Sequence, residues 1–356
     1  MMRLFGDYYK GKTVLVTGHT GFVGYWLCRV LIHAGAKVVG YSLDEPEKAA
    51  TTELISIVGD IRDKEYLRKA FDEYTPEIVF HLAAQTQKDQ ARFAPLYTYE
   101  TNILGTLNVL ESVRNTSGVK SVVVASSSNI YQEEQWAWAY RANDVIKGEE
   151  PLSDSIVCSE SIVNTYRNTY FNKVNSPAVS IVRFGNAFGG GDYTEGKLLT
   201  ECIAAARESR VIDVHNSNGI RPYIHVLDVV RGILLLADRH CQEKILVGEY
   251  NFSPDYDNCA LNGDIAMLFC KEWGENMSSR YKYDNNYEND RLKIRLDNSK
   301  SKNLLLWVPN WNLKESIARL VKWEKSVING VSANEITDRQ INDYFSEMKT
   351  LKNPCL

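Results

Sequence analysis

A glycine-rich turn near the start of the chain constrains the fold more than any other feature. It joins a short β-branched run, Lys12–Thr17, to an apolar helical pattern at 25–31. Gly18 can make the tight turn, Gly21 lets a backbone approach a pyrophosphate, and Gly24 allows the helix to pack closely on the strand. Glycines also mark ordinary turns, so the meaning of the pattern depends on the elements that follow.

Short apolar runs continue at 37–41, 54–58 and 77–82, and helical patterns separate them. This alternation predicts an α/β fold with a Rossmann-type, doubly wound parallel sheet covered on both faces. After the second run, Asp44 and Glu45 stand where a carboxylate would bind the ribose hydroxyls, and no basic residue is nearby. NAD is therefore favoured over NADP, although a solvated turn would also explain these acids.

Composition indicates a two-part protein of the cytoplasm. The chain has 356 residues, 44% of them hydrophobic, and a net charge of -4, so neither nucleic acid nor a membrane is indicated as a partner. Seven cysteines lie scattered without metal-ligand spacing, which suits a reducing compartment and predicts no metal site. The longest apolar stretches, such as 232–237, are far shorter than the roughly 20 residues that span a bilayer.

The second half of the chain is less regular. A further strand is predicted at 177–183, followed by a glycine-dense loop at 185–192 that is suited to approach a ligand backbone or phosphate. A smaller C-terminal α/β substrate lobe should then close over the cleft at the carboxyl ends of the sheet. We expect a dinucleotide-binding domain at 10–183 to which 226–252 returns, a lobe at 184–330 and a helical tail at 331–356, with helices at 197–209, 226–238, 261–273 and 313–328.

Longer stretches carry a specific resemblance. The chain resembles the extended short-chain dehydrogenase/reductase superfamily and, within it, the CDP-glucose 4,6-dehydratases, over roughly residues 10 to 325. The resemblance implies bound NAD, a nucleotide sugar with a CDP-hexose favoured, a role in deoxysugar or surface-polysaccharide biosynthesis, and a homodimer formed by helices at about 97–114 and 153–172. Apolar residues on these helices could form a shared core, namely Ile103, Leu107, Leu110, Ile162 and Val163. The matching stretches are Thr17–Phe22, Gly59–Asp63, Pro76–Gln85, Thr101–Thr106, Trp136–Arg141, Arg183–Asn186, Gly189–Tyr193, Arg221–Leu227, Asn251–Pro254 and Trp307–Trp311.

The family's catalytic groups are absent from their matching positions. Its pattern Pro-Tyr-Ser-x-Ser-Lys aligns with Pro151–Ile156, so that Leu152 replaces the tyrosine and Ile156 the lysine. A tyrosine titrates near 10 in water, and the lysine one helical turn away normally lowers that pKa. In the preceding strand the family's serine or threonine remains as Ser126, but Ser128 and Asn129 replace the Asp-Lys pair of the dehydration step. These side chains cannot serve as acid and base.

No other tyrosine and lysine at this spacing offers an obvious substitute. Tyr8 and Lys12 precede the first strand, away from the carboxyl ends of the sheet where ligands bind. Tyr193 and Lys197 lie in a loop with Gly196 between them, so helical spacing cannot be assumed there. We assign no base from the sequence.

The resemblance also implies ligand-binding residues. For Asn102 a purely structural hydrogen bond is an equal alternative, and for Arg221 the alternative is a surface salt bridge. Asn186 and Arg221 would bind the diphosphate of the sugar nucleotide, and Tyr193 and Arg183 would contact the substrate. The cofactor would be held by Gly18, Thr20, Gly21, Phe22, Gly24, Asp60, Ile61, Ala83, Ala84 and Gln85.

Two classes of function remain open. One is an NAD-dependent dehydratase or epimerase that acts on a nucleotide sugar through a base not recognised in the sequence. The other is a non-catalytic protein that holds NAD and a nucleotide hexose and acts as a regulator or as the partner of an active paralogue. The joint loss of tyrosine and lysine favours the second for mechanism, whereas the retained ligand positions favour the first for ligands.

Overall fold

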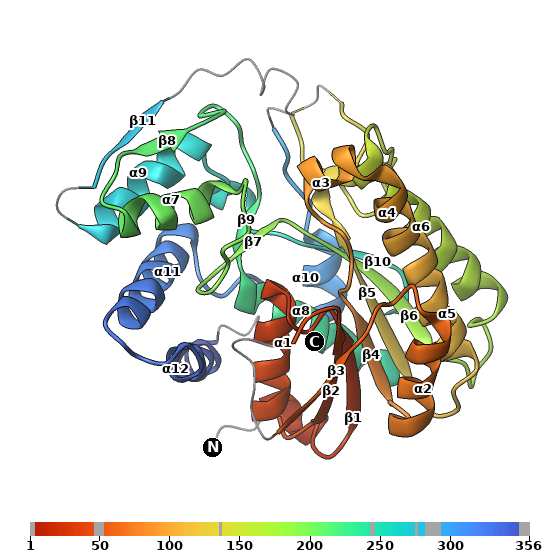
Figure 1. The fold of residues 1–356 in the computed structure, drawn as a ribbon. Coiled ribbons are helices and arrows are strands. Elements are labelled where there is room, and N and C mark those ends of the chain that lie inside the picture. The colour runs from red at the N-terminus through yellow and green to blue at the C-terminus, as the bar shows by residue number, and fades with distance from the viewer. Residues whose placement is uncertain are drawn as a thin grey trace.

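A computed structural model describes residues 4–45, 53–134, 137–242, 246–274, 277–281 and 293–348 (Figure 1). Trp136, which belongs to one of the matching stretches, and the end of the predicted tail at 349–356 lie outside the described residues.

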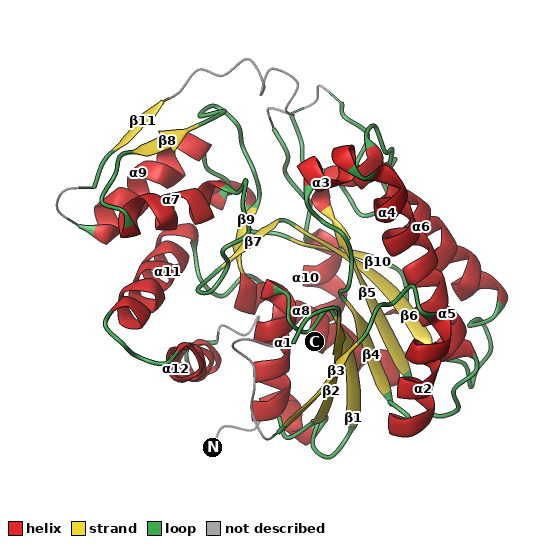
Figure 2. Cartoon of the chain, in the orientation of Figure 1, coloured by secondary structure: helices red, strands yellow, loops and turns green. Residues whose placement is uncertain are grey.

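The centre of the fold is a seven-stranded sheet in which every neighbouring pair is parallel (Figure 2). The strand order is β10-β6-β5-β4-β1-β2-β3, so the order reverses on either side of β1. That reversal leaves a ligand crevice at the carboxyl ends of β1 and β4. The strands are β1 (Thr13–Thr17), β2 (Lys37–Ser42), β3 (Leu54–Val58), β4 (Ile78–His81), β5 (Ser121–Ser127), β6 (Ala178–Phe184) and β10 (Glu249–Phe252).

Helices cover both faces of this sheet, as the alternation of side chains along the strands requires. In β1, Val14 and Val16 belong to one buried cluster with α1 (Phe22–His33) and α8 (Val226–Gln242). Leu15 belongs to a second cluster on the opposite face. That face is covered by α2 (Lys64–Tyr74), α5 (Gly105–Arg114) and α6 (Pro151–Thr169), with α3 (Lys88–Phe93), α4 (Pro95–Tyr99) and the π-helical turn η2 (Glu100–Leu104) leading into α5.

The outer edge of β10 is closed by side chains rather than by another strand. Helix α10 (Ser299–Leu305) lies along this edge. The Lys300 ammonium donates to the carbonyl oxygen of Glu249 at 2.9 Å, and the Ser301 hydroxyl donates to that of Asn251 at 2.6 Å. These bonds satisfy backbone groups that an edge strand would otherwise expose to pairing.

A second lobe is built on its own apolar core of helices and two short parallel strand pairs. Figure 1 shows this lobe beside the carboxyl ends of the main sheet, with β7 and β9 running between the two. Its elements are β7 (Asn186–Phe188), α7 (Leu198–Arg207), β8 (Ile212–Val214), β9 (Tyr223–His225), α9 (Asn262–Trp273), β11 (Ser279–Tyr281) and α11 (Leu313–Ile328); short 3-10 turns lie at Leu4–Asp7, Ser128–Ile130 and Tyr256–Asn258.

The last helix, α12 (Ala333–Ser346), is packed against both parts of the molecule. On the α1 side, Asp338 forms ion pairs with Arg29 and His33. On the α11 side, Arg319 binds Asp343 at 2.7 Å. The helix therefore ties the first helix of the sheet domain to the second lobe.

The predicted doubly wound α/β fold is confirmed. Predicted strands at 54–58 and 177–183 correspond to β3 and β6, and the predicted helix at 313–328 corresponds to α11. Helix α8 and strand β10 pack on the main sheet after the chain has left it for β7 and α7. Among the described residues, no helix is both long and apolar enough to cross a membrane.

Candidate functional site

The glycine turn after β1 has the geometry of a phosphate cradle. Gly18 has a φ of +75°, and a Cβ there would lie 2.7 Å from the backbone nitrogen of Ala83. A Cβ on Gly24 would lie 2.1 Å from the Gly18 carbonyl oxygen, so α1 sits as close to the strand as only glycine allows. Gly21 is exposed and caps α1, next to the half-exposed Thr20 and Phe22. The N-terminus of α1 is therefore accessible at the switch point, where its first amides could bind a dinucleotide pyrophosphate.

The chain after β4 forms the opposite wall of this crevice. Ala84 is exposed and Ala83 half-buried, whereas the side chain of Gln85 is buried and bonded internally to Gln87 and Thr98. Gln85 therefore does not offer its side-chain amide to the crevice. Asn102 accepts a bond from the Gln85 amide nitrogen at 2.8 Å and donates to the Ser155 hydroxyl of α6 at 2.9 Å. Asn102 therefore braces this wall against α6.

Asp60 and Ile61, the residues expected to border the adenine, differ in accessibility. Ile61 is buried against α5, where a Cβ on Gly105 would lie 2.4 Å from its Cδ1 atom. Asp60 is bound by Arg62 at 2.6 Å. Burial works to raise the pKa of the Asp60 carboxyl, but the hydrogen bonds and charge of Arg62 outweigh it and lower the pKa overall. Asp60 lines an open cavity of about 520 Å³ together with Arg62, Asp63, Lys64, Glu100, Leu104 and Asn108.

Helix α6 begins where the sequence comparison requires. Pro151 is its first residue, and Glu150 caps it by accepting bonds from the amides of Leu152 and Ser153. Glu160, one turn beyond Ile156, is 1% exposed, and its Oε1 atom accepts a bond from the Ser126 hydroxyl at 2.5 Å. Because residues four apart share a helix face, this contact turns the face of Ile156 and Leu152 toward the end of β5.

Arg183 corrects our expectation of a substrate contact. Its side chain is 3% exposed, and its guanidinium binds both oxygens of Glu160, at 2.9 and 2.6 Å. It also donates to the Tyr131 hydroxyl and to the carbonyl oxygen of Ala142. Four hydrogen bonds thus hold this guanidinium in the protein interior, so we reassign Arg183 as a positioning residue.

Other candidate bases at the carboxyl ends of the strands are occupied or buried. Burial lowers the pKa of His81 to about 4, and its ring nitrogens are bonded to Thr17 and Thr106. Burial raises the pKa of Tyr131 to about 12. At the former dehydration pair, Ser128 is buried and Asn129 exposed, and neither side chain is an acid or a base at neutral pH.

Asn186 and Arg221 are brought together between the main sheet and the lobe. Asn186 pairs with Tyr223 in the β7–β9 ladder, two residues beyond Arg221. A Cβ on Gly185 would lie 1.9 Å from the Pro222 carbonyl oxygen, so the segments that carry these two residues are in close contact. The Arg221 guanidinium donates to the Ile220 carbonyl oxygen at 3.1 Å and is half-buried. The two residues thus lie on neighbouring segments, because Asn186 pairs with the residue two positions after Arg221.

The glycine-dense loop has a different neighbour from the one predicted. A Cβ on Gly190 would lie 2.0 Å from the ring of Trp323 on α11, so this glycine admits an indole rather than a ligand. Tyr193 accepts a bond from Arg207 at 2.8 Å, and burial raises its pKa to about 12. Lys197 is paired with Asp192 at 2.8 Å, so Tyr193 and Lys197 do not form a catalytic pair.

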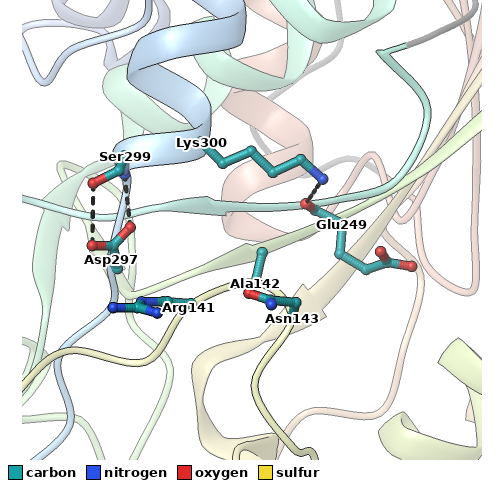
Figure 3. Close-up of a pocket in the computed structure, with 7 residues that line it drawn as sticks. All are labelled: Arg141, Ala142, Asn143, Glu249, Asp297, Ser299 and Lys300. Atoms are coloured by element: carbon teal, nitrogen blue, oxygen red, sulfur yellow. Dashed lines mark hydrogen bonds between the residues drawn. The ribbon is translucent and has the colours of Figure 1, made fainter.

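Sequence reasoning missed Glu160 and the pocket behind β10. The available signal for Glu160 was an acid four residues after Ile156, on the same face of the predicted helix. The pocket, of about 500 Å³, lies at the edge capped by Lys300, and Figure 3 shows the Glu249 carboxylate pointing away from the Lys300 amine. Its lining residues are Arg141, Ala142, Asn143, Glu249, Asp297, Ser299 and Lys300.

The parallel sheet, the glycine cradle at its switch point and the adjoining lobe define a dinucleotide-binding protein of the doubly wound α/β class. Residues 14–248 match the family described as the NAD dependent epimerase/dehydratase family. The chain belongs to this family, and the predicted superfamily relationship and its NAD dependence are thereby confirmed.

Its relatives include dehydratases and epimerases. The chain is 35% identical over 352 residues to CDP-glucose 4,6-dehydratase of Salmonella typhimurium (strain LT2), covering 96% of this chain and 98% of that protein. It is 25% identical over 339 residues to UDP-glucuronate 4-epimerase of Thermodesulfobacterium geofontis, covering 90% and 99%.

Solved structures share the fold. UDP-glucose 4-epimerase with UDP-glucose from Thermotoga maritima has a TM-score of 0.79 at 23% identity, covering 89% of this chain and 99% of that one. dTDP-glucose 4,6-dehydratase from Bacillus anthracis in complex with NAD has a TM-score of 0.75 at 19% identity, covering 91% and 100%.

Proposed function

We propose that this protein holds NAD and a nucleotide hexose, with a CDP-hexose favoured, and does not carry out 4,6-dehydration through the groups its relatives use. One observation carries the proposal. Helix α6 keeps its register against β5 through the bond between Glu160 and Ser126, yet the positions that face the end of β5 one and two turns earlier hold Ile156 and Leu152. Aliphatic side chains can neither take nor give the proton of a sugar hydroxyl.

The NAD half of the proposal is supported by the cradle at Gly18, Gly21 and Gly24. When bound, NAD would supply hydride-accepting chemistry. The residues of this chain would hold its pyrophosphate through the first amides of α1 and confine its other side by the backbone at 83–85. Exposed Asp44 and Glu45 follow β2, where the ribose hydroxyls of NAD would need an acceptor.

The sugar-nucleotide half is supported by Asn186 and Arg221 on the wall between the sheet domain and the lobe. A guanidinium is the side chain best suited to grip a diphosphate. The relationship to CDP-glucose 4,6-dehydratase favours a CDP-hexose, and a place in deoxysugar or surface-polysaccharide biosynthesis in the cytoplasm follows from it.

A homodimer through α5 and α6 belongs to the same proposal. These helices pack beside each other on one face of the sheet, and Leu104 in the preceding turn is 49% exposed. Ile103, Leu107 and Ile162 are partly exposed and available for such a contact. Leu110 and Val163, which periodicity also suggested, are buried inside the protomer and cannot contribute.

Two measurements test the proposal. Mass spectrometry of the supernatant from denatured protein should find NAD or NADH, and a protein that is empty and also ignores added NAD would overturn the cofactor assignment. The unmodified protein, loaded with NAD, should bind CDP-glucose without converting it. Accumulation of a 4-keto-6-deoxy sugar would show that an active enzyme with another base is the correct alternative.

A non-catalytic regulator or partner of an active paralogue remains compatible with this site. Co-expression with such a paralogue, followed by a pull-down and an activity measurement with and without this chain, would distinguish that role from a homodimer.

A further inference from the structure

We propose that Glu160 fixes Ser126 as a hydrogen-bond acceptor, so that this position of the cleft selects a ligand hydroxyl group over a ligand carbonyl oxygen. This inference rests on the proposed function and specifies which form of the sugar the site prefers. Ser126 lies at the carboxyl end of β5 and is partly exposed, whereas Glu160 behind it is almost wholly buried.

The Ser126 hydroxyl has a single hydrogen, and its direction follows from the partners of Glu160. The guanidinium of Arg183 donates through Nε to Oε1 and through Nη2 to Oε2 of Glu160. An arginine is always charged and can only donate, so both carboxylate oxygens act as acceptors. The Ser126 oxygen lies 2.5 Å from Oε1, a length typical of a hydroxyl that donates to a carboxylate.

Neighbouring bonds prevent the carboxylate from turning away. Arg183 is held on its other side by the Ala142 carbonyl oxygen at 2.8 Å and the Tyr131 hydroxyl at 3.0 Å. Since Tyr131 accepts from Arg183, its own hydrogen goes to the side-chain oxygen of Asn251 at 2.6 Å. The Asn251 amide in turn donates to the Tyr140 carbonyl oxygen. These bonds hold the Arg183 guanidinium in place against Glu160.

Only lone pairs of Ser126 remain for the cleft. A ligand hydroxyl can donate to them, whereas a carbonyl oxygen would place two acceptors against each other without a hydrogen between them. Oxidation of that hydroxyl to a ketone would therefore lose a bond at Ser126.

Binding of two probes to the NAD-saturated full chain tests the inference. The probes are CDP-glucose, which has hydroxyls throughout its sugar, and CDP-4-keto-6-deoxyglucose. The ratio of their dissociation constants is measured by calorimetry for the wild type and for Ser126→Ala. We expect the preference for CDP-glucose to fall about tenfold in Ser126→Ala, which is the contribution of one hydrogen bond.

The neighbouring serine provides a matched control. Ser127 points to the other face of β5, and its hydroxyl oxygen accepts a bond from the Asn129 amide rather than contacting Glu160. Ser127→Ala should keep the wild-type ratio. The double variant Glu160→Gln with Arg183→Gln removes both charges together and avoids an unpaired buried arginine; it should lower the ratio as Ser126→Ala does.

The outcomes separate this inference from the proposed function. If both probes bind and Ser126→Ala leaves their ratio unchanged, the inference is wrong and the proposed function stands. If neither probe binds, the proposed function fails and the inference falls with it. Neutron diffraction of the ligand-free protein is a further test that needs no probe: deuterium on Ser126 should point at Glu160, and deuterium directed into the cleft would overturn the inference.

Discussion

Asp228 offers a quantitative test of how the last helix is held in place. Its carboxyl is fully buried at the start of α8, and its Oδ1 atom accepts bonds from the Asn310 amide at 2.6 Å and the Tyr344 hydroxyl of α12 at 2.5 Å. Among the described residues, Oδ2 has no hydrogen-bond partner. An asparagine can therefore keep its oxygen at Oδ1, so Asp228→Asn retains both bonds and removes the charge.

The expected magnitude follows from the pKa of this group. Burial raises the pKa of Asp228 from 3.8 to about 6, despite the opposing effects of Arg231 and the hydrogen-bond donors. The folded protein thus holds this proton more tightly than the unfolded chain does. The free energy of unfolding consequently falls by about 3 kcal/mol in total as the pH rises from about 4 to about 6. Above pH 6 this contribution stays constant.

Urea unfolding of wild type and Asp228→Asn between pH 4.5 and pH 8 measures this effect. The variant should gain about 2 kcal/mol relative to wild type across that range, because pH 4.5 already lies above the unfolded pKa, whatever constant cost the new amide carries. Asp338→Asn is the control with the opposite sign: burial works against ionisation there, but His33 and Arg29 lower the pKa of Asp338 overall, so its loss should cost more at high pH. Parallel pH profiles for wild type and Asp228→Asn would refute the reasoning.

Three further predictions concern the site and its supports. In Leu152→Tyr with Ile156→Lys, the phenol and ammonium would again share one helix face, so CDP-glucose should reduce bound NAD. Absorbance at the NADH wavelength in a single-turnover mixture should show this reduction, and the wild type should give no such signal. Full turnover should also require Ser128→Asp and Asn129→Lys. Gly190→Ala should lower the free energy of unfolding by about 3 kcal/mol, measured by thermal unfolding, because the new methyl group meets the Trp323 ring. Gly196→Ala is the control: its methyl group enters open space at a φ of +81°, and it should lower the free energy of unfolding by only about 1 kcal/mol. Leu104→Glu should halve the mass found by light scattering at micromolar concentration, and a wild type that is already monomeric would contradict the dimer.

The sheet domain was predictable because its signals are local. The apolar run at 177–183 reports a strand buried on both faces, and the spacing of Gly18, Gly21 and Gly24 reports one turn conformation. The positions of Leu152 and Ile156 on α6 were likewise readable, since helix periodicity and a proline start fix their register.

The partners of buried polar residues were not predictable, because they come from distant parts of the chain. Arg183 carries the same charge whether it binds a phosphate or Glu160, and only the packing of α6 on β6 decides between them. From the sequence, Gly190 suggests space for a ligand. In the structure, Trp323 of α11, more than 100 residues later, fills that space. Leu110 and Val163 show the same limit, because periodicity cannot tell a protomer core from an interface.

The position of α12 has a consequence for how the protein is made. Helix α1 is synthesised early, but Asp338, which binds its Arg29 and His33, is synthesised more than 300 residues later. Strand β10 of the main sheet is likewise not complete until residue 252. While the lobe is being synthesised, the sheet domain therefore lacks strand β10 at one edge, and helix α1 lacks its contacts with α12. We expect premature termination before residue 333 to leave a chain that aggregates or is degraded rather than a shortened but folded protein.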